Sequence, residues 1–207
     1  MADLKKHFGM KEKILQAAEQ EEDINKAEFR DEMIESAEFS CVCFHLCNFN
    51  GCHINSCTTE NLYFEDTVFE GCDISNSSFT DSCFRRVKFI RCKLMGTDFS
   101  GSVFDFSEFS DCSCRFAGFT SAKFKHTAFS GCDLAESTFQ ECTLAHTGFL
   151  QCRLQKSDFL HTPLSGIDLT SDEIEGLSVA GPELRGAKVT MMQACGLARY
   201  LGLIISG

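Results

Sequence analysis

The chain has 207 residues, with 30 acidic and 19 basic side chains, and a formal net charge of −11. This length is enough to bury one sizeable core, and no Pro-rich or Ser/Gly-rich linker divides the chain, so we expect one domain. The negative charge disfavours direct binding to nucleic acid or to an anionic membrane, because both repel carboxylates. It favours a partner with a basic surface.

The apolar residues indicate a dry interior and a reducing compartment. Twenty-one Phe stand beside two Tyr and no Trp, so the chain uses aromatic rings almost without polar groups on them. No apolar run is long enough for a secretion signal or a membrane span, and we expect a cytoplasmic protein. Its 14 cysteines should then stay reduced.

The first segment, residues 1–22, predicts a helix. Its part from Lys11 to Glu22 is rich in helix formers and places Ile14, Leu15 and Ala18 at helical spacing. We expect this helix to cap the first layer of the core that follows.

From residue 23 to residue 190 the sequence has a period of five. An apolar residue recurs every five positions from Ile24 to Val189 without a slip in register, which makes 34 such positions. Eighteen are Phe, seven Leu, five Ile and two Val, and only Thr59 and Cys114 depart from the pattern. A small or apolar residue stands two positions before each of them, and the other three positions are mostly polar.

A period of five fits a very short strand that ends in a corner. Residues two apart in a strand face the same side, so the small residue and the large one both point inward. The residue between them faces outward, and the last two turn the corner. Repetition closes the chain into coils that stack with ladder hydrogen bonds about 4.8 Å apart.

A slower period gives the number of sides. Every fourth large position lacks an aromatic ring. The small position of the same units holds a cysteine every twenty residues, at Cys52, Cys72, Cys92, Cys112, Cys132 and Cys152. Four units therefore make one turn, and residues twenty apart lie above one another. We expect a four-sided prism of about eight coils.

The units A-E-F-S-C, T-D-F-S-G and C-D-L-A-E, which begin at Ala37, Thr97 and Cys132, resemble the A(D/N)LXX pattern of the pentapeptide-repeat family. The resemblance covers the chain from about Glu22 to Met191. It implies an all-β solenoid, a right-handed quadrilateral β-helix, here with short N- and C-terminal α-helices. It is specific for fold and weak for function, because the repeat describes a scaffold.

Residues 191–207 predict a C-terminal helix, with Thr190 as N-cap and Gly202 at its end, followed by an apolar tail. One interpretation is a lid on the last coil. We favour a homodimer interface, because helix and tail together offer more apolar surface than one small prism end can absorb. The dimerisation residues would be Met191, Ala194, Cys195, Leu197, Ala198, Leu201, Leu203, Ile204 and Ile205.

No pattern in the chain predicts catalysis, a cofactor or a metal site. A core filled with side chains leaves no room for a substrate, and the chain has no Gly-rich phosphate loop, H-E-x-x-H motif or nucleophile elbow. The cysteine column points inward as small hydrophobic residues, while Cys41, Cys43 and Cys83 should face outward. His126 and His146 stack on one side but are too few to bind a metal.

The most distinctive surface feature is one acidic side, built around Phe39 and every twentieth residue after it. Its exposed positions hold no Lys or Arg, whereas the other three sides mix both signs. A merely solvated acidic face is one interpretation, since acids are in excess. The other is that a rod of duplex-like width with a regular row of carboxylates imitates DNA for a protein with a basic groove. This acidic stripe consists of Glu38, Glu60, Asp81, Asp98, Glu141 and Asp158.

The segment from Gly186 to Gly207, G-A-K-V-T-M-M-Q-A-C-G-L-A-R-Y-L-G-L-I-I-S-G, is similar to the closing segment of the quinolone-resistance pentapeptide-repeat proteins, the Qnr family. This resemblance implies a dimeric DNA mimic that binds DNA gyrase or topoisomerase IV and protects it from fluoroquinolones. Many Qnr proteins interrupt their coils with loops, whereas this register is unbroken, which leaves open whether protection or inhibition dominates. The competing classes are a repeat scaffold for an unrelated basic protein and a thiol-based redox or metal protein.

Overall fold

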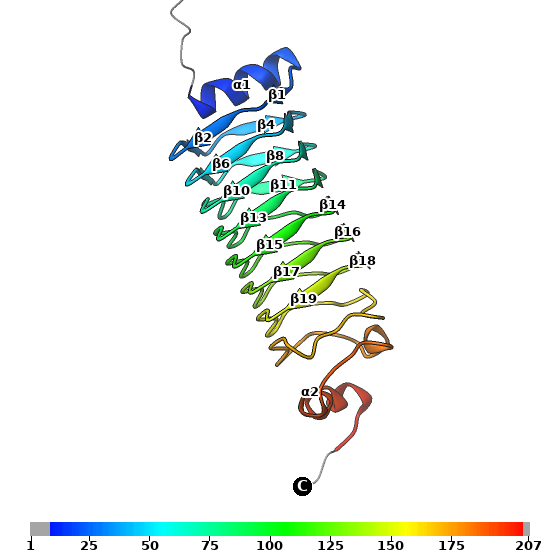
Figure 1. Cartoon of the computed structure of the whole chain (residues 1–207). Helices are drawn as coiled ribbons and strands as arrows, with labels where there is room; N and C mark the ends of the chain where they lie inside the picture. Colours follow the sequence, from blue (N-terminus) through cyan, green and yellow to red (C-terminus); the bar gives the residue numbers. More distant parts are fainter. Residues whose placement is uncertain (1–8, 205–207) are drawn as a thin grey trace, which may run out of the picture.

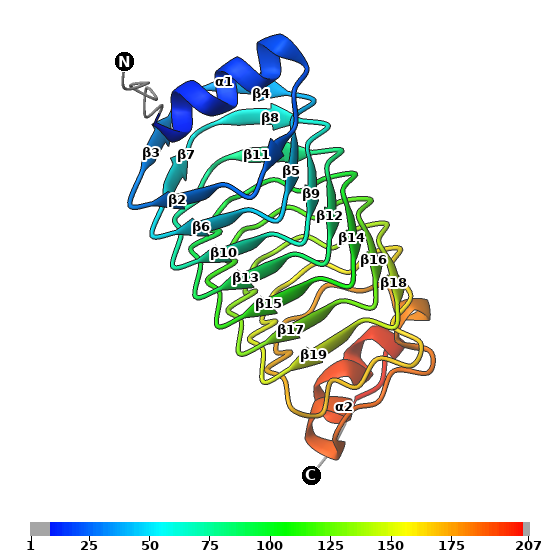
Figure 2. The same cartoon turned by 45° about the horizontal axis from the view of Figure 1, so that its top comes forward.

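The computed structural model describes residues 9–204, which form a stack of coils with one helix at each end (Figure 1). An oblique view along the stack shows that each coil has four sides (Figure 2). Residues twenty apart pair in parallel register, as Phe44 does with Phe64. The expected parallel β-solenoid with a twenty-residue turn is confirmed.

Two of the four sides are seven-stranded parallel sheets. The β1 side consists of β1 (Ile24–Asn25), β5 (Cys43–His45), β9 (Tyr63–Glu65), β12 (Cys83–Arg85), β14 (Val103–Asp105), β16 (Lys123–Lys125) and β18 (Thr143–Ala145). The β2 side consists of β2 (Glu28–Arg30), β6 (Asn48–Asn50), β10 (Val68–Glu70), β13 (Lys88–Ile90), β15 (Glu108–Ser110), β17 (Ala128–Ser130) and β19 (Gly148–Leu150).

The other two sides have strands only in the first coils. The β4 side contains β4 (Glu38–Ser40), β8 (Thr58–Glu60) and β11 (Ser78–Thr80), and the β3 side contains β3 (Met33–Glu35) and β7 (His53–Asn55). Further along, both continue as isolated bridges between residues twenty apart. In these coils the backbone N–H three positions after an inward-facing apolar residue donates to the carbonyl oxygen of that residue. The N–H of Thr97, for example, donates to the carbonyl oxygen of Leu94 at 3.2 Å. This tightens the corner and shortens the strand.

The stack contains slightly fewer coils of regular strand than the eight expected. The seven strands of the β1 side step through six turns, from Ile24 to Leu144. After Leu150 the described residues contain no further strand of this kind, and the coils pair through isolated bridges, of which the last links Asp168 to Lys188. The expected number of eight coils of strand was therefore too high. The five-residue sequence pattern continues to Val189, but in the last coils tightened corners replace the three-residue strands.

The core is a set of stacked rings, as the two periods predicted. Rings one coil apart lie face to face, with centroids 4.6 Å apart for Phe44 and Phe64. Rings of different sides meet edge to face, as Phe99 and Phe104 do at 5.6 Å. Each such pair adds about 0.5–1.5 kcal/mol beyond the burial of its area. The aromatic columns therefore stabilise neighbouring coils against one another.

Thr59 and Cys114, the two exceptions to the apolar repeat, are both buried. Thr59 satisfies its hydroxyl by donating to the carbonyl oxygen of Ser78 at 2.6 Å. A cavity of about 10 Å³ is lined in part by Phe39 and Phe79, the large residues one coil before and after Thr59. A space of this size holds about one water at most, so it is too small for a substrate.

The N-terminal helix, α1 (Met10–Gln20), closes the first coil. It begins one residue before the expected Lys11 and ends two residues before Glu22. Its buried residues are Met10, Ile14 and Ala17, which lie on one helical face at spacings of four and three. Leu15 and Ala18, which we expected in that face with Ile14, pack at its edge and are only partly buried.

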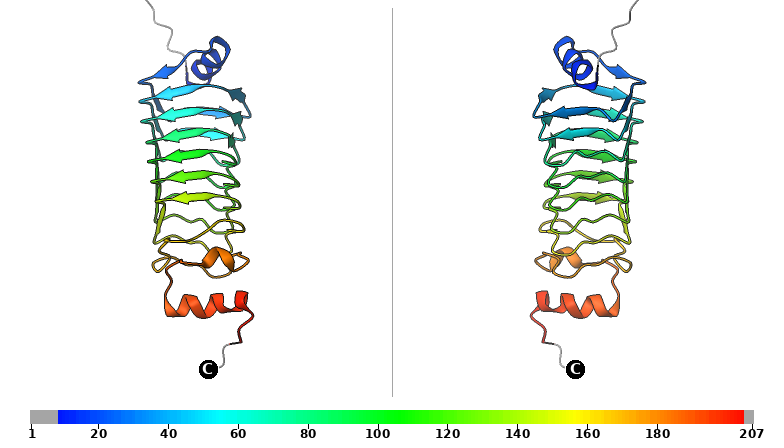
Figure 3. Two further views of the ribbon diagram at one scale, coloured as in Figure 1. Left: turned by 90° about the vertical axis from the view of Figure 1, so that its right-hand side faces the viewer. Right: turned by 90° about the vertical axis from the view of Figure 1, so that its left-hand side faces the viewer.

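The C-terminal region contains the short 3-10 helix η1 (Pro182–Leu184), α2 (Met191–Leu197) and η2 (Ala198–Leu201). Thr190 is the N-cap, as expected, and its side chain accepts from the N–H of Gln193. Gly202 ends the segment in the left-handed region at φ 67°, but the expected single helix changes to 3-10 geometry at Ala198. α2 lies across the end of the stack (Figure 3). Among the described residues, no helix is long and apolar enough to span a membrane.

Candidate functional site

The six carboxylates of the acidic stripe all lie on the β4 side, in three parallel columns. Glu38, Asp98 and Asp158 share one column because they differ by multiples of twenty. Glu60 lies on the other edge of its strand, and Asp81 shares a corner column with Glu141. The fold therefore brings the stripe to one side of the rod, as the period of twenty predicted.

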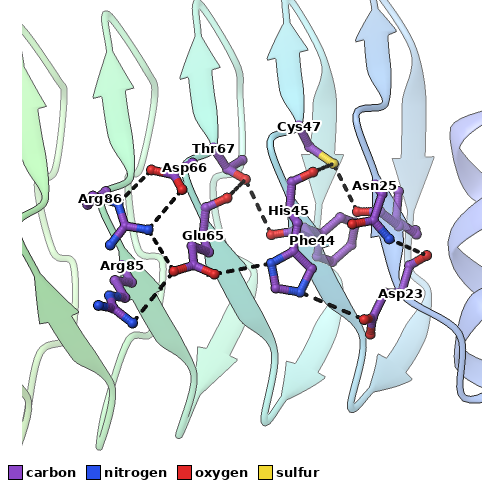
Figure 4. A network of polar contacts seen from close by, with 11 residues as sticks. Asp23, Asn25, Phe44, His45, Cys47, Glu65, Asp66, Thr67, Arg85 and Arg86 are labelled. Carbon is purple, nitrogen blue, oxygen red and sulfur yellow. Dashed lines mark hydrogen bonds and ion pairs between the residues drawn. The ribbon is translucent and has the colours of Figure 1, made fainter.

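Each of the other three sides contains ion pairs between neighbouring coils. On the β1 side, Arg86 contacts both Asp66 and Glu65 at 2.6 Å (Figure 4). The Arg86 guanidinium lowers the pKa of the Asp66 carboxyl by hydrogen bonding to it. Pairs twenty residues apart on the other two sides are Lys88 with Glu108 at 3.1 Å, Lys188 with Asp168 at 2.6 Å and Arg153 with Asp133 at 3.3 Å.

The β4 side differs, because none of the six stripe carboxylates takes part in an ion pair within residues 9–204. Exposed ion pairs contribute little stability, roughly 0–1 kcal/mol each, so this difference hardly affects folding. It does affect the field outside the rod, because the unpaired charges add up over the β4 side.

The six stripe residues are not equivalent. Asp98 and Asp158 are half-buried, and each accepts the backbone N–H two residues on, that of Ser100 and that of Leu160, at 2.9 Å. Asp158 also accepts from Nε2 of Gln140 at 2.6 Å. These two carboxylates stabilise turns of the coil. The exposed members of the stripe are Glu38, Glu60, Asp81 and Glu141.

The C-terminal end of the rod is apolar and incompletely covered. No residue of α2 is buried, and the exposed fractions of Met191, Leu203 and Ile204 are 84%, 58% and 96%. Ala194 and Cys195 are exposed, and Leu197 and Ala198 are half-buried. The side chain of Leu201 and all of Ile205 lie outside the described residues.

A cavity of about 630 Å³ lies between the last coil and the C-terminal helices. Leu184 and Val189 line it from the coil, and Leu197 and Tyr200 line it from α2 and η2. The contacts that hold α2 in place are partly polar, since Nε2 of Gln193 donates to the carbonyl oxygens of Leu169 at 2.7 Å and Asp172 at 2.9 Å. The helix is thus attached to the last coil without sealing it.

Apart from Cys43, the cysteines and histidines that the sequence singled out are not clustered with other metal-binding side chains within residues 9–204. The six cysteines of the twenty-residue column are buried, and Cys41, Cys43 and Cys83 lie at the surface or half-buried. Burial raises the pKa of the Cys142 thiol to about 12, which keeps it protonated at neutral pH. His126 and His146 stack with ring centroids 4.9 Å apart, and the described residues place no third metal-binding group beside them.

One cluster escaped the sequence analysis. Asp23, Cys43 and His45 meet at the N-terminal end of the β1 side, with one ligand atom of each within 4.8 Å of the others. The signal was present, because Asp23 and Cys43 differ by twenty and therefore stack, and residues 43 and 45 face outward on the same strand. It was missed because each residue alone looks like an ordinary surface position.

Taken together, a four-sided coil with a filled interior and its distinctive polar groups on the outside is a repeat scaffold. A sequence model described as the pentapeptide repeat region matches residues 62–139 and 104–179, which together are more than half of the chain. The chain belongs to the pentapeptide-repeat family.

Two solved structures are similar to the chain. A trypsin-treated variant of QnrB1, described as a plasmid-mediated fluoroquinolone resistance protein, is 22% identical with a TM-score of 0.43, and the match covers 89% of this chain and 99% of that one. HetL, a pentapeptide repeat protein involved in heterocyst differentiation regulation from the cyanobacterium Nostoc, is 12% identical with a TM-score of 0.39, covering 88% of this chain and 95% of that one. No curated protein sequence matches the chain.

Proposed function

We propose that this chain is a DNA-mimicking scaffold that binds a type II topoisomerase, DNA gyrase or topoisomerase IV, and protects it from fluoroquinolones or modulates its response to them. The observation that carries the proposal is the β4 side, where exposed carboxylates have no cation partner while the other three sides contain ion pairs. The similarity of the segment from Gly186 to Gly207 to the Qnr proteins supports the choice of enzyme class.

The spacing of these charges indicates what kind of binding to expect. Glu38 and Asp158 are six coils apart, which is roughly 29 Å at about 4.8 Å per coil. A DNA duplex carries one charge per about 1.7 Å of its axis, so a stretch of equal length has more charges than the stripe. The rod is therefore a weaker polyanion than DNA. We expect it to bind a basic groove by shape together with charge, with an affinity that falls as salt is raised.

We further propose that the rod is a homodimer joined through its C-terminal ends. The incompletely covered cavity and the exposed Met191, Leu203 and Ile204 support this, because a contiguous apolar end is unfavourable in water unless a partner covers it. A two-fold contact there doubles the length of the rod and repeats the acidic stripe on both halves.

The test is DNA supercoiling by purified gyrase in the presence of a fluoroquinolone, with the chain titrated in. One variant combines Glu38→Gln, Glu60→Gln, Asp81→Asn and Glu141→Gln, which removes the exposed stripe charges without touching the turn-forming Asp98 and Asp158. The matched control neutralises the same number of exposed acids on other sides, namely Glu28, Glu35, Asp111 and Glu175.

We expect the wild-type chain and the control to change supercoiling at the same concentration, and the stripe variant to need at least about tenfold more, which corresponds to about 1.4 kcal/mol of lost binding. If supercoiling by gyrase and decatenation by topoisomerase IV, each with and without drug, are unchanged across the titration, the proposal fails. The chain would then belong with repeat scaffolds that bind another basic protein. Equal potency of the two variants would remove the stripe from the mechanism.

A further inference from the structure

The N-terminal end of the β1 side gathers three side chains of the kinds that bind zinc. The carboxylate of Asp23, the thiol of Cys43 and the imidazole of His45 are an oxygen, a sulfur and a nitrogen ligand, and Zn²⁺ is bound by all three kinds in proteins. Asp23 immediately precedes β1, and the other two lie on β5 on either side of the buried Phe44. We propose that Asp23, Cys43 and His45 form a binding site for a divalent transition metal ion, with Zn²⁺ as the ion best suited to these ligands.

The distances suit a tetrahedral ion with little movement. One ligand atom from each residue lies within 4.8 Å of the other two, and Nε2 of His45 is 3.8 Å from Oδ2 of Asp23. Ligand atoms around Zn²⁺ are about 3.3–3.8 Å apart when its bonds are about 2.0–2.3 Å long. The side chain of Asp23 is 54% exposed, so it can rotate to bring its carboxylate within bonding distance of an ion. Cys43 and His45 are held in place on a strand that pairs on both edges.

A second carboxylate orients the imidazole for this role. Glu65 lies one coil below His45 and its Oε2 is 3.3 Å from Nδ1 of His45 (Figure 4). An Nδ1–H donated to Glu65 leaves Nε2 free for an ion, which is the arrangement of carboxylate, histidine and zinc common in metal sites. Arg86 holds Glu65 in turn at 2.6 Å, so the second carboxylate is fixed by the same network.

The surroundings favour binding over ordinary surface hydration. The imidazole of His45 is 28% exposed, and the ring of Tyr63 packs 5.6 Å from its centroid. An aspartate and a thiolate together balance the charge of a divalent ion, and the thiol loses its proton to water when the ion binds. Three protein ligands leave one position for water or an outside ligand.

Binding at this site would join the residue that precedes the first strand to the second coil. Because Asp23 lies between α1 and β1, an ion would hold the start of the solenoid under its helical cap. We therefore expect bound Zn²⁺ to raise the thermal midpoint of unfolding, since a ligand that binds only the folded state stabilises it by mass action.

The experiment is titration of the purified, reduced full chain with Co²⁺ and Zn²⁺. Co²⁺ reports its ligands by a thiolate-to-metal charge-transfer band, and the Zn²⁺ affinity follows from competition with a chromophoric chelator. We expect one ion per chain, loss of the band in Cys43→Ser, and loss of tight Zn²⁺ binding in both Cys43→Ser and His45→Ala. Glu65→Ala should weaken Zn²⁺ binding by about 10–100-fold while the band persists at saturating Co²⁺, because it orients the imidazole without touching the ion.

The matched controls are Cys83→Ser, which changes a half-buried cysteine two coils further along the same column, and His146→Ala. Both should keep the band, the affinity and the rise in thermal midpoint. The proposal is overturned if the chain binds no ion tightly, or if the band survives Cys43→Ser and disappears instead with Cys41→Ser or Cys195→Ser. Circular dichroism of each variant separates loss of binding from loss of fold.

Discussion

Corner residues explain much of the conformational cost of this fold. They adopt left-handed backbone angles in coil after coil, for example Asp81 at φ 52° and Asn76 at φ 56°. Outside glycine this region costs roughly 1 kcal/mol per residue, less for Asn and Asp, and the ladder and ring contacts between coils offset it. Corners also restrict one another, since Oδ1 of Asp81 occupies the space that a Cβ at Gly101 would need.

At the residue scale we predict that Gly101→Ala destabilises the protein more than Gly71→Ala does. Both glycines have positive φ, 71° and 61°, but a Cβ at Gly71 meets nothing within 4 Å. Gly71→Ala should therefore cost only the backbone strain, about 1 kcal/mol, and Gly101→Ala somewhat more, because the Asp81 side chain must turn away from the new methyl group. Thermal and urea unfolding of the two variants measure this. Equal losses, or no relief of the Gly101→Ala loss by a second change of Asp81→Ala, would contradict the collision.

The two terminal helices are elements of different kinds, although the sequence makes both amphipathic. α1 buries Met10, Ile14 and Ala17 against the first coil, whereas α2 buries no residue. A solenoid needs a cap because its end coil has neighbours on one side only. α1 covers the first coil within one chain, whereas α2 covers the last coil only in part.

At the element scale we predict that Ile14→Ala lowers the stability of the first coils while Met192→Ala does not. Ile14 is 1% exposed and its loss should cost about 2–4 kcal/mol, whereas Met192 is 81% exposed. Amide hydrogen exchange should show faster exchange in β1 to β4 for Ile14→Ala, because an uncapped coil frays first. Similar losses for the two variants would mean that α2 packs as tightly as α1.

On the scale of the whole molecule, the rod has one closed end and one open end. An open end on both sides would allow filaments, but a single apolar end permits only a closed pair. α1 and α2 lie at opposite ends of the stack, so a C-terminal pair leaves both α1 caps at the outer tips (Figure 1). The proposed homodimer is therefore limited to two chains by the shape of its subunit.

We predict that Met191→Lys combined with Leu203→Lys gives a monomer in sedimentation equilibrium, while the wild-type chain sediments as a dimer. The added charges would have to be buried in the interface, which is unfavourable without partners. The control is Met33→Lys, which alters a methionine on the β3 side that is 63% exposed and lies far from α2. This control should remain dimeric with an unchanged circular dichroism spectrum. A monomeric wild-type chain at the same concentrations would contradict the dimer.

Most of the fold could be predicted because contacts in a solenoid follow a fixed interval along the chain. Once the period of twenty was found, it placed Phe44 above Phe64 and gathered the stripe on one side. The candidate site was less predictable. Asp98 and Asp158 look like Glu38 in the sequence, but they accept backbone N–H groups and have a structural role.

The sequence by itself determined the solenoid, its four sides, its aromatic core and the capping residues Thr190 and Gly202, because these depend on periodicity and on backbone preferences that act locally. Only the tertiary structure decided where strands give way to tightened corners, how incompletely α2 covers the last coil, and that Asp23 reaches Cys43 and His45. These features depend on side-chain rotamers and on distances of a few ångströms. At the ends of the rod, moreover, the repeat stops and no periodic neighbour fixes what a residue contacts.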